Sequence, residues 1–191
     1  MLARRRFLLA AALLAAFVIS PSAADAQGPT VVILARHAEK VVPNPPDGDP
    51  ELTAVGQTRA QALAEALSAT GIDAVITTQW KRTRFTAQPL AEREGLTPEV
   101  VSTSGAQAHP DAVADAVRRH AGHTVLVVGH SNTVPAIIAA LGGPRLPDIC
   151  DSQHANLFVL VLGPGKEPAL IRSRYGAPDP APGPECAPMT R

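Results

Sequence analysis

The sequence lacks an excess of charge, a long apolar run after its first 26 residues, and any pattern typical of a metal or nucleotide site. Lys+Arg and Asp+Glu number 17 each in 191 residues. That balance gives no basic face for nucleic acid and no general attraction to anionic lipid. The chain has no P-loop, no EF-hand carboxylate spacing and no CxxC pair. We therefore expect no metal, no cofactor and no magnesium-dependent mechanism.

The first 26 residues have the three parts of a secretory signal peptide. Arginines at positions 4–6 precede an apolar run of 13 residues at 7–19, and the small residues Ala24 and Ala26 follow. We expect cleavage after Ala26, by either the Sec or the twin-arginine route, and a periplasmic or secreted protein. The alternative is an uncleaved membrane anchor, although the run is shorter than the ~18 residues that span a bilayer.

Removal of this segment takes away three arginines and Asp25. The mature chain then has 14 Lys+Arg and 16 Asp+Glu, a net charge of −2, and no membrane span. The two cysteines, Cys150 and Cys186, form an even pair. In an oxidising compartment such a pair favours one disulfide, although two free thiols are the alternative.

Apolar runs and helical patterns alternate through residues 27–176. We expect strands at 31–35, 73–78, 99–103, 123–130, 156–162 and 169–175, the last two as a hairpin. We expect helices at 54–69 with Thr53 as N-cap, at 81–93, within 106–120, and at 133–141. This alternation predicts one α/β domain, a three-layer sandwich with a mostly parallel central sheet. Residues 177–191 are rich in Pro, Ala and Gly and predict a poorly ordered tail.

Three of the expected strands end at or shortly before histidine or arginine. Arg36 and His37 follow the first strand, His130 follows the fourth, and Arg82 and Arg84 lie a few residues after the second. Ligands of such sheets bind beyond the carboxyl ends of the strands. Arginine matches the oxygens of a phosphate group, and histidine can act as a nucleophile. The pattern therefore favours a site for a transferring phosphoryl group.

Four segments carry a more specific resemblance. They read LARHAEK at 34–40, LTAVGQTRAQALAEAL at 52–67, TTQWKRTRFTAQPLA at 77–91 and VLVVGHSNTVPAII at 125–138. In this order they resemble the motifs of the histidine phosphatase superfamily, which includes the phosphoglycerate mutase-like enzymes. The chain is similar to a small, exported member of the branch-1 type, and the resemblance implies a phosphoglycerate mutase-like fold.

The resemblance also implies a role for each matched residue. His37 would be the nucleophile that forms a phosphohistidine. Arg36 and Arg82 would bind the phosphate oxygens, and His130 would donate to them in the transition state. Arg82 is preferred to Arg84 because of its spacing from the Thr-Ala pair that follows in the motif.

The general acid that protonates the leaving oxygen is left open by the sequence. Acid phosphatases of the family have His-Asp where this chain has His130-Ser131. Glu39 lies two residues after His37 and is the candidate that we name. The remaining candidates are Glu92, Glu94, Glu99, His109 and His154. The single tryptophan, Trp80, is expected either to line the mouth of the pocket or to act as a half-buried anchor.

These observations predict an exported, metal-independent phosphatase that hydrolyses a phosphomonoester. Its substrate would be a small phosphorylated molecule or a phosphate of the cell envelope. Three alternatives remain: a phosphate-binding module of the same fold without activity, a phosphohistidine or phosphoprotein phosphatase, and a metalloenzyme with His37 and His130 as ligands. The last is weak, because Arg36 and Arg82 would repel a cation.

Overall fold

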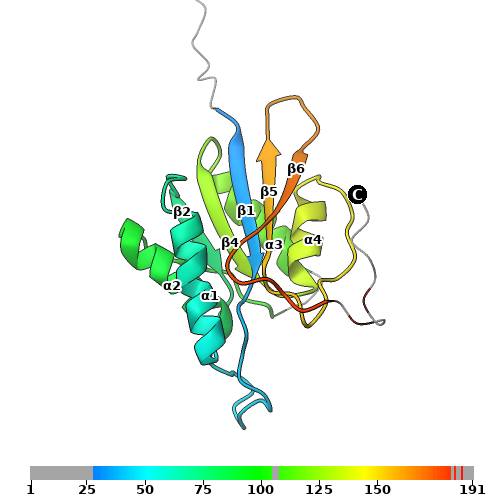
Figure 1. Ribbon diagram of the computed structural model, residues 1–191. Helices are drawn as coiled ribbons and strands as arrows, with labels where there is room; N and C mark the ends of the chain where they lie inside the picture. The colour runs from blue at the N-terminus through cyan, green and yellow to red at the C-terminus, as the bar shows by residue number, and fades with distance from the viewer. Residues whose placement is uncertain (1–27, 105–107, 182, 184–185, 187–191) are drawn as a thin grey trace, which may run out of the picture.

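Six strands form one sheet in the order β3-β2-β4-β1-β5-β6 (Figure 1). The structure is a computed structural model, and it describes residues 28–104, 108–181, 183 and 186. Strands β3, β2, β4 and β1 pair in parallel, whereas β5 is antiparallel to both β1 and β6. The strands span Thr30–Arg36 (β1), Ala74–Thr77 (β2), Glu99–Val100 (β3), Thr124–Gly129 (β4), Asn156–Leu162 (β5) and Ala169–Arg174 (β6). The mostly parallel sheet and the closing hairpin agree with the sequence prediction.

Two pairs of helices cover the two faces of this sheet. Helices α1 (Ala54–Ala66) and α2 (Lys81–Glu94) pack on one face, and α3 (His109–Arg119) and α4 (Thr133–Ala140) pack on the other. Side chains of β1 alternate between the two cores, because successive residues of a strand point to opposite faces. Val32 and Leu34 join the α3/α4 core, and Ile33 and Ala35 join the α1/α2 core. The predicted three-layer α/β sandwich is therefore confirmed.

Local signals fix the helix ends. The Oγ1 atom of Thr53 accepts a hydrogen bond from the amide of Gly56 at 3.0 Å, so Thr53 is the predicted N-cap of α1. Helix α2 ends at Gly95, whose φ of 66° is left-handed and suits glycine. Pro89 lies inside α2 without ending it. Strand β3 is shorter than the predicted range, since it covers only Glu99 and Val100.

The register of β1 against β4 sets the place of the predicted site. Arg36 lies opposite Gly129 at the carboxyl end of the pair. The amide of His37 then donates to the carbonyl oxygen of Gly129 at 2.9 Å. His37 and His130, the residues that follow, consequently leave the sheet at the same height and edge.

The segment after β6 is more ordered at Asp179 than predicted, because buried contacts fix the Asp179 side chain. The Asp179 side chain is 1% exposed and lies 3.7 Å from Nη2 of Arg59 on α1. Its Oδ1 atom accepts hydrogen bonds from the amides of His154 at 2.8 Å and Ala155 at 3.0 Å. A buried carboxylate with these partners anchors residues that composition alone assigned to a poorly ordered tail.

The disulfide between Cys150 and Cys186 is present, as the sequence predicted for an oxidised chain. It connects the loop before β5 to the segment after β6. The proposed signal peptide and its cleavage position lie outside the described residues. Within the described ranges, no helix combines the length and hydropathy that a bilayer span requires.

We predict that Asp179→Ala lowers the free energy of unfolding by about 2–4 kcal/mol. The change leaves two buried amides without an acceptor and removes one carboxylate from the buried Arg59 guanidinium. Urea denaturation measures the effect. Asp115→Ala is the matched control, because it breaks an exposed pair with Arg118 and should cost less than about 1 kcal/mol. Equal effects of the two variants would contradict the anchoring role of Asp179.

Candidate active site

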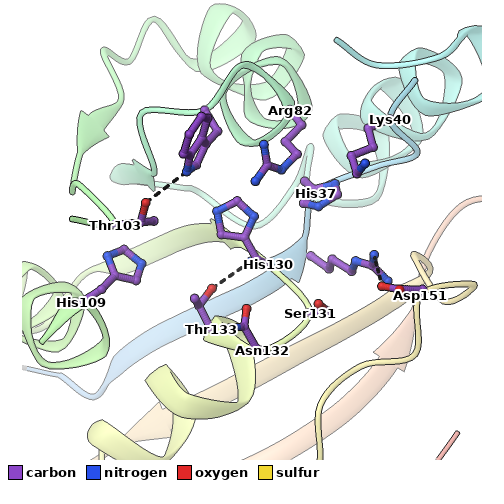
Figure 2. Close-up of a pocket in the computed structure, with 12 residues that line it drawn as sticks. His37, Lys40, Arg82, Thr103, His109, His130, Ser131, Asn132, Thr133 and Asp151 are labelled. Carbon is purple, nitrogen blue, oxygen red and sulfur yellow. Dashed lines mark hydrogen bonds and ion pairs between the residues drawn. The ribbon is translucent and has the colours of Figure 1, made fainter. Parts of the chain in front are cut away.

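A pocket of about 410 Å³ opens at the carboxyl edge of the sheet (Figure 2). Its wall includes Arg36 and His37 at the end of β1, His130 after β4, and Arg82 in the first turn of α2. The structure thus brings together the four residues that sequence reasoning assigned to the phosphate site. Arg84 is exposed elsewhere on α2 and does not line this pocket.

One ring nitrogen of His37 forms a hydrogen bond to the backbone. Its Nδ1 atom lies 2.8 Å from the carbonyl oxygen of Ala38. A carbonyl oxygen only accepts, so Nδ1 carries the proton and the lone pair of a neutral ring is on Nε2. The carbonyl oxygen of His37 accepts from Nδ1 of His154 at 3.0 Å, and the hydroxyl of Thr86 accepts from the amide of Ala38. The Nδ1–H bond thus orients the imidazole, and the other two contacts hold the peptide group between His37 and Ala38.

His130 stands beside His37, with 5.5 Å between the two ring centroids. The amide of His130 donates to Oγ1 of Thr133 at 2.9 Å, and its Nε2 atom lies 3.2 Å from Oγ1 of Thr78. Gly129 has no room for a side chain, because an added Cβ would lie 2.9 Å from Oγ1 of Thr133. The turn from β4 into α4 is therefore tight, and it fixes the height of His130.

Both imidazoles are neutral at physiological pH. The pKa of His37 is lowered to about 2, mainly by burial; the hydrogen bond to Ala38 opposes this shift and the charge of Arg36 adds to it. Burial also lowers the pKa of His130 to about 3, with the charge of Arg82 as the next cause. A neutral His37 keeps its Nε2 lone pair available for attack. A phosphate dianion in the pocket would favour the protonated form of His130 and so create a donor.

The two arginines are positioned by different partners. Nη1 of Arg36 donates to the carbonyl oxygens of Cys150 at 2.6 Å and Gln153 at 3.2 Å, and Nη2 pairs with Asp151 at 3.1 Å. The buried Nε of Arg36 has no hydrogen-bond partner among the described residues. The guanidinium of Arg82 lies 5.0 Å from the ring centroid of Trp80. Trp80 is thus both a half-buried anchor and part of the pocket wall.

Glu39 does not reach the pocket, so the structure does not support it as the acid. Nε of Arg59 donates to both of its carboxylate oxygens, at 2.8 Å and 3.0 Å. Burial raises the pKa of Glu39, but the hydrogen bonds from Arg59 lower it, and the pKa lies below the usual value. A proton donor near neutral pH needs a raised pKa instead. Glu39 is close to His37 in the sequence, and this spacing does not reveal that its carboxylate pairs with Arg59, 20 residues further along the chain.

Other candidates fall into two groups. His109 lines the pocket, whereas Glu92, Glu94, Glu99 and His154 do not. Sequence reasoning missed Thr103 and Asp151, which also lie on the wall. They follow no motif, and only the fold brings their loops to this edge. In the part of the chain that the structure describes, no three His, Cys, Asp or Glu residues are grouped closely enough to hold a metal ion.

The model of the histidine phosphatase superfamily (branch 1) matches residues 32–103. The matched range contains Arg36, His37 and Arg82, and His130 lies beyond it. No curated protein matches the chain.

Several solved structures share the fold at low sequence identity. The protein histidine phosphatase SixA, in complex with tungstate, is 17% identical, with a TM-score of 0.60 and coverage of 75% of this chain and 96% of that one. The putative phosphohistidine phosphatase SixA from Agrobacterium tumefaciens is 22% identical, with a TM-score of 0.57 and coverage of 78% and 99%. A mycobacterial glucosyl-3-phosphoglycerate phosphatase is 20% identical, with a TM-score of 0.52 and coverage of 69% and 89%.

The solved structures establish the common fold, and the match to the family model includes the segments that contain Arg36, His37 and Arg82. The chain is therefore similar to the histidine phosphatase superfamily (branch 1) over residues 32–103, and it shares the fold of the solved phosphatases.

Proposed function

We propose that this protein is a phosphatase that hydrolyses a phosphomonoester through a phosphohistidine on His37. The observation that carries the proposal is the committed tautomer of His37, whose Nδ1–H donates to Ala38 and leaves Nε2 as the nucleophilic atom. Arg36, Arg82 and His130 around the same pocket support it. Structures with the same fold carry phosphatase names, and the SixA structure is a complex with tungstate.

The reaction follows from these positions in two steps. In the first, Nε2 of His37 attacks phosphorus, the bond to the leaving oxygen breaks, and that oxygen takes up a proton. In the second, water attacks the phosphohistidine, releases inorganic phosphate and restores neutral His37. Arg36 and Arg82 bind the outer phosphoryl oxygens, and His130 donates to them once the dianion has favoured its protonation.

We also propose that the protein works outside the cytoplasm, on a small phosphorylated molecule or a cell-envelope phosphate. The Cys150–Cys186 disulfide supports this, since such bonds persist in oxidising compartments. Expressed as the full chain in a Gram-negative host, it should accumulate in the periplasmic fraction. Mass spectrometry should find an N-terminus at Gln27 and a mass two hydrogens below that of the dithiol. A full-length, reduced protein in the cytoplasmic fraction would contradict export.

His37→Asn should lower kcat/KM on p-nitrophenyl phosphate at least a thousand-fold, on the order of other losses of an essential nucleophile. The Asn side chain can still donate to the Ala38 carbonyl, so the fold is preserved while Nε2 is lost. The exposed His123 gives the control variant His123→Asn, which should retain activity. Wild-type activity should persist in EDTA. Phosphate binding without turnover would favour a binding module, and loss in EDTA would favour a metalloenzyme.

The covalent intermediate gives an independent test of the same nucleophile. Rapid quenching with labelled substrate should trap a phosphoenzyme that survives base and is lost in acid. An acid-stable phosphoester would show that a hydroxyl, not His37, is the nucleophile.

Arg82→Ala should lower kcat/KM about a hundred-fold or more, because it removes a charged donor to the transferring phosphoryl group. Arg84→Ala is the matched control on the same helix. Its side chain is exposed and outside the pocket, so its activity should stay within about threefold of wild type. Steady-state kinetics on one substrate compare the two. A larger loss in Arg84→Ala would mean that the assignment of the second arginine is wrong.

A further inference from the structure

His109 is a buried histidine on the wall of the same pocket that the two-step reaction leaves without a role. It is the first residue of α3, its exposed fraction is 2%, and it lines the pocket together with Thr103. Figure 2 shows its imidazole beside Thr103, with His130 between it and His37. His109 therefore lies on the side of the pocket away from the nucleophile.

One nitrogen of the His109 ring has a hydrogen-bond partner and the other has none among the described residues. Nδ1 of His109 lies 3.0 Å from the carbonyl oxygen of Ser102, so it carries a proton and donates it there. Nε2 is buried and has no hydrogen-bond partner among the described residues. Buried polar atoms are nearly always paired, so an unpaired one at a pocket wall indicates a partner that arrives with the ligand.

The geometry of phosphoryl transfer identifies that partner. The attacking and leaving atoms lie roughly in line on opposite sides of phosphorus. With Nε2 of His37 on one side, the leaving oxygen is directed away from His37, toward the side that holds Thr103 and His109. The remaining pocket residues with a titratable proton are engaged elsewhere: Lys40 donates to Asn44, and Asp151 pairs with Arg36.

We propose that His109 is the general acid in its doubly protonated form, in which Nδ1–H donates to Ser102 and Nε2–H donates to the leaving oxygen. This rests on the proposed function. As the P–O bond breaks, the oxygen takes the proton of Nε2–H and leaves as an alcohol, and His109 becomes neutral. Nε2 then accepts a proton from the water that attacks phospho-His37, which restores the acid. The Nδ1–H bond to Ser102 holds throughout. The substrate class is then phosphate esters of aliphatic alcohols, whose poor leaving oxygen requires protonation.

His109→Asn tests the role, because the Asn amide can keep the bond to Ser102 while Nε2 is removed. Methyl or glyceryl phosphate represents the poor leaving group, and p-nitrophenyl phosphate represents one that leaves as an anion. We expect kcat on the alkyl phosphate to fall about a hundred-fold or more. On p-nitrophenyl phosphate it should change by only a few fold. The thermal midpoint and the KM values of the variant check that its pocket is intact.

Equal losses on the two substrates, or no loss on either, would overturn the proposal. Wild-type enzyme alone provides a second measurement: across alkyl and aryl phosphates, its kcat/KM should depend weakly on the leaving-group pKa. A wild type that turns over aryl phosphates but not alkyl phosphates would also contradict the acid. These outcomes are distinct from failure of the phosphatase proposal, in which wild type would turn over neither substrate.

Discussion

The parallel pairing of β1 and β4 determines where both histidines of this site lie. Arg36 is opposite Gly129, so the next residue of each strand, His37 and His130, emerges at one edge. A slip of one residue would move every side chain of a strand to the other face. The two aliphatic cores, which take alternate residues of β1, make that slip costly. The packing of the two cores therefore fixes the register of β1 and β4, and this register sets the positions of His37 and His130 at the edge of the sheet.

Burial gives the pocket its electrostatic character. Two guanidinium groups remain charged while both imidazoles are neutral, since desolvation opposes the protonation of histidine. A phosphate dianion then meets permanent cations in a region where charge interacts more strongly than in water. The same burial keeps His37 unprotonated. Burial therefore both strengthens the attraction between the arginines and a phosphate and leaves a lone pair on Nε2 of His37. A bound dianion would favour the protonated form of His130, which could then serve as a donor.

The sequence predicted the features that depend on local pattern and on motif spacing. The strand before Arg36-His37, the Thr53 N-cap and the position of Arg82, rather than Arg84, on the pocket wall are of this kind. It could not predict the partner of Glu39, because Arg59 lies 20 residues away. It also underestimated the order around Asp179, whose carboxylate is buried through contacts with Arg59 and with two amides just before β5. Such long-range pairs have no periodicity, so the short spacing from His37 made Glu39 a candidate acid, and composition placed Asp179 in a poorly ordered tail.

The loop that carries Cys150 has a consequence for the entropy of binding. Arg36 lost its rotational freedom when the chain folded, since the carbonyls of Cys150 and Gln153 already fix its guanidinium. The two carbonyl oxygens orient the group without cancelling its charge, and the one carboxylate that pairs with it, that of Asp151, is exposed to solvent. An incoming phosphate therefore immobilises no flexible arginine on this side of the pocket, and less of its interaction energy is lost to ordering the protein. Cys150 thus takes part in positioning Arg36 through its backbone oxygen, while its sulfur forms the disulfide with Cys186.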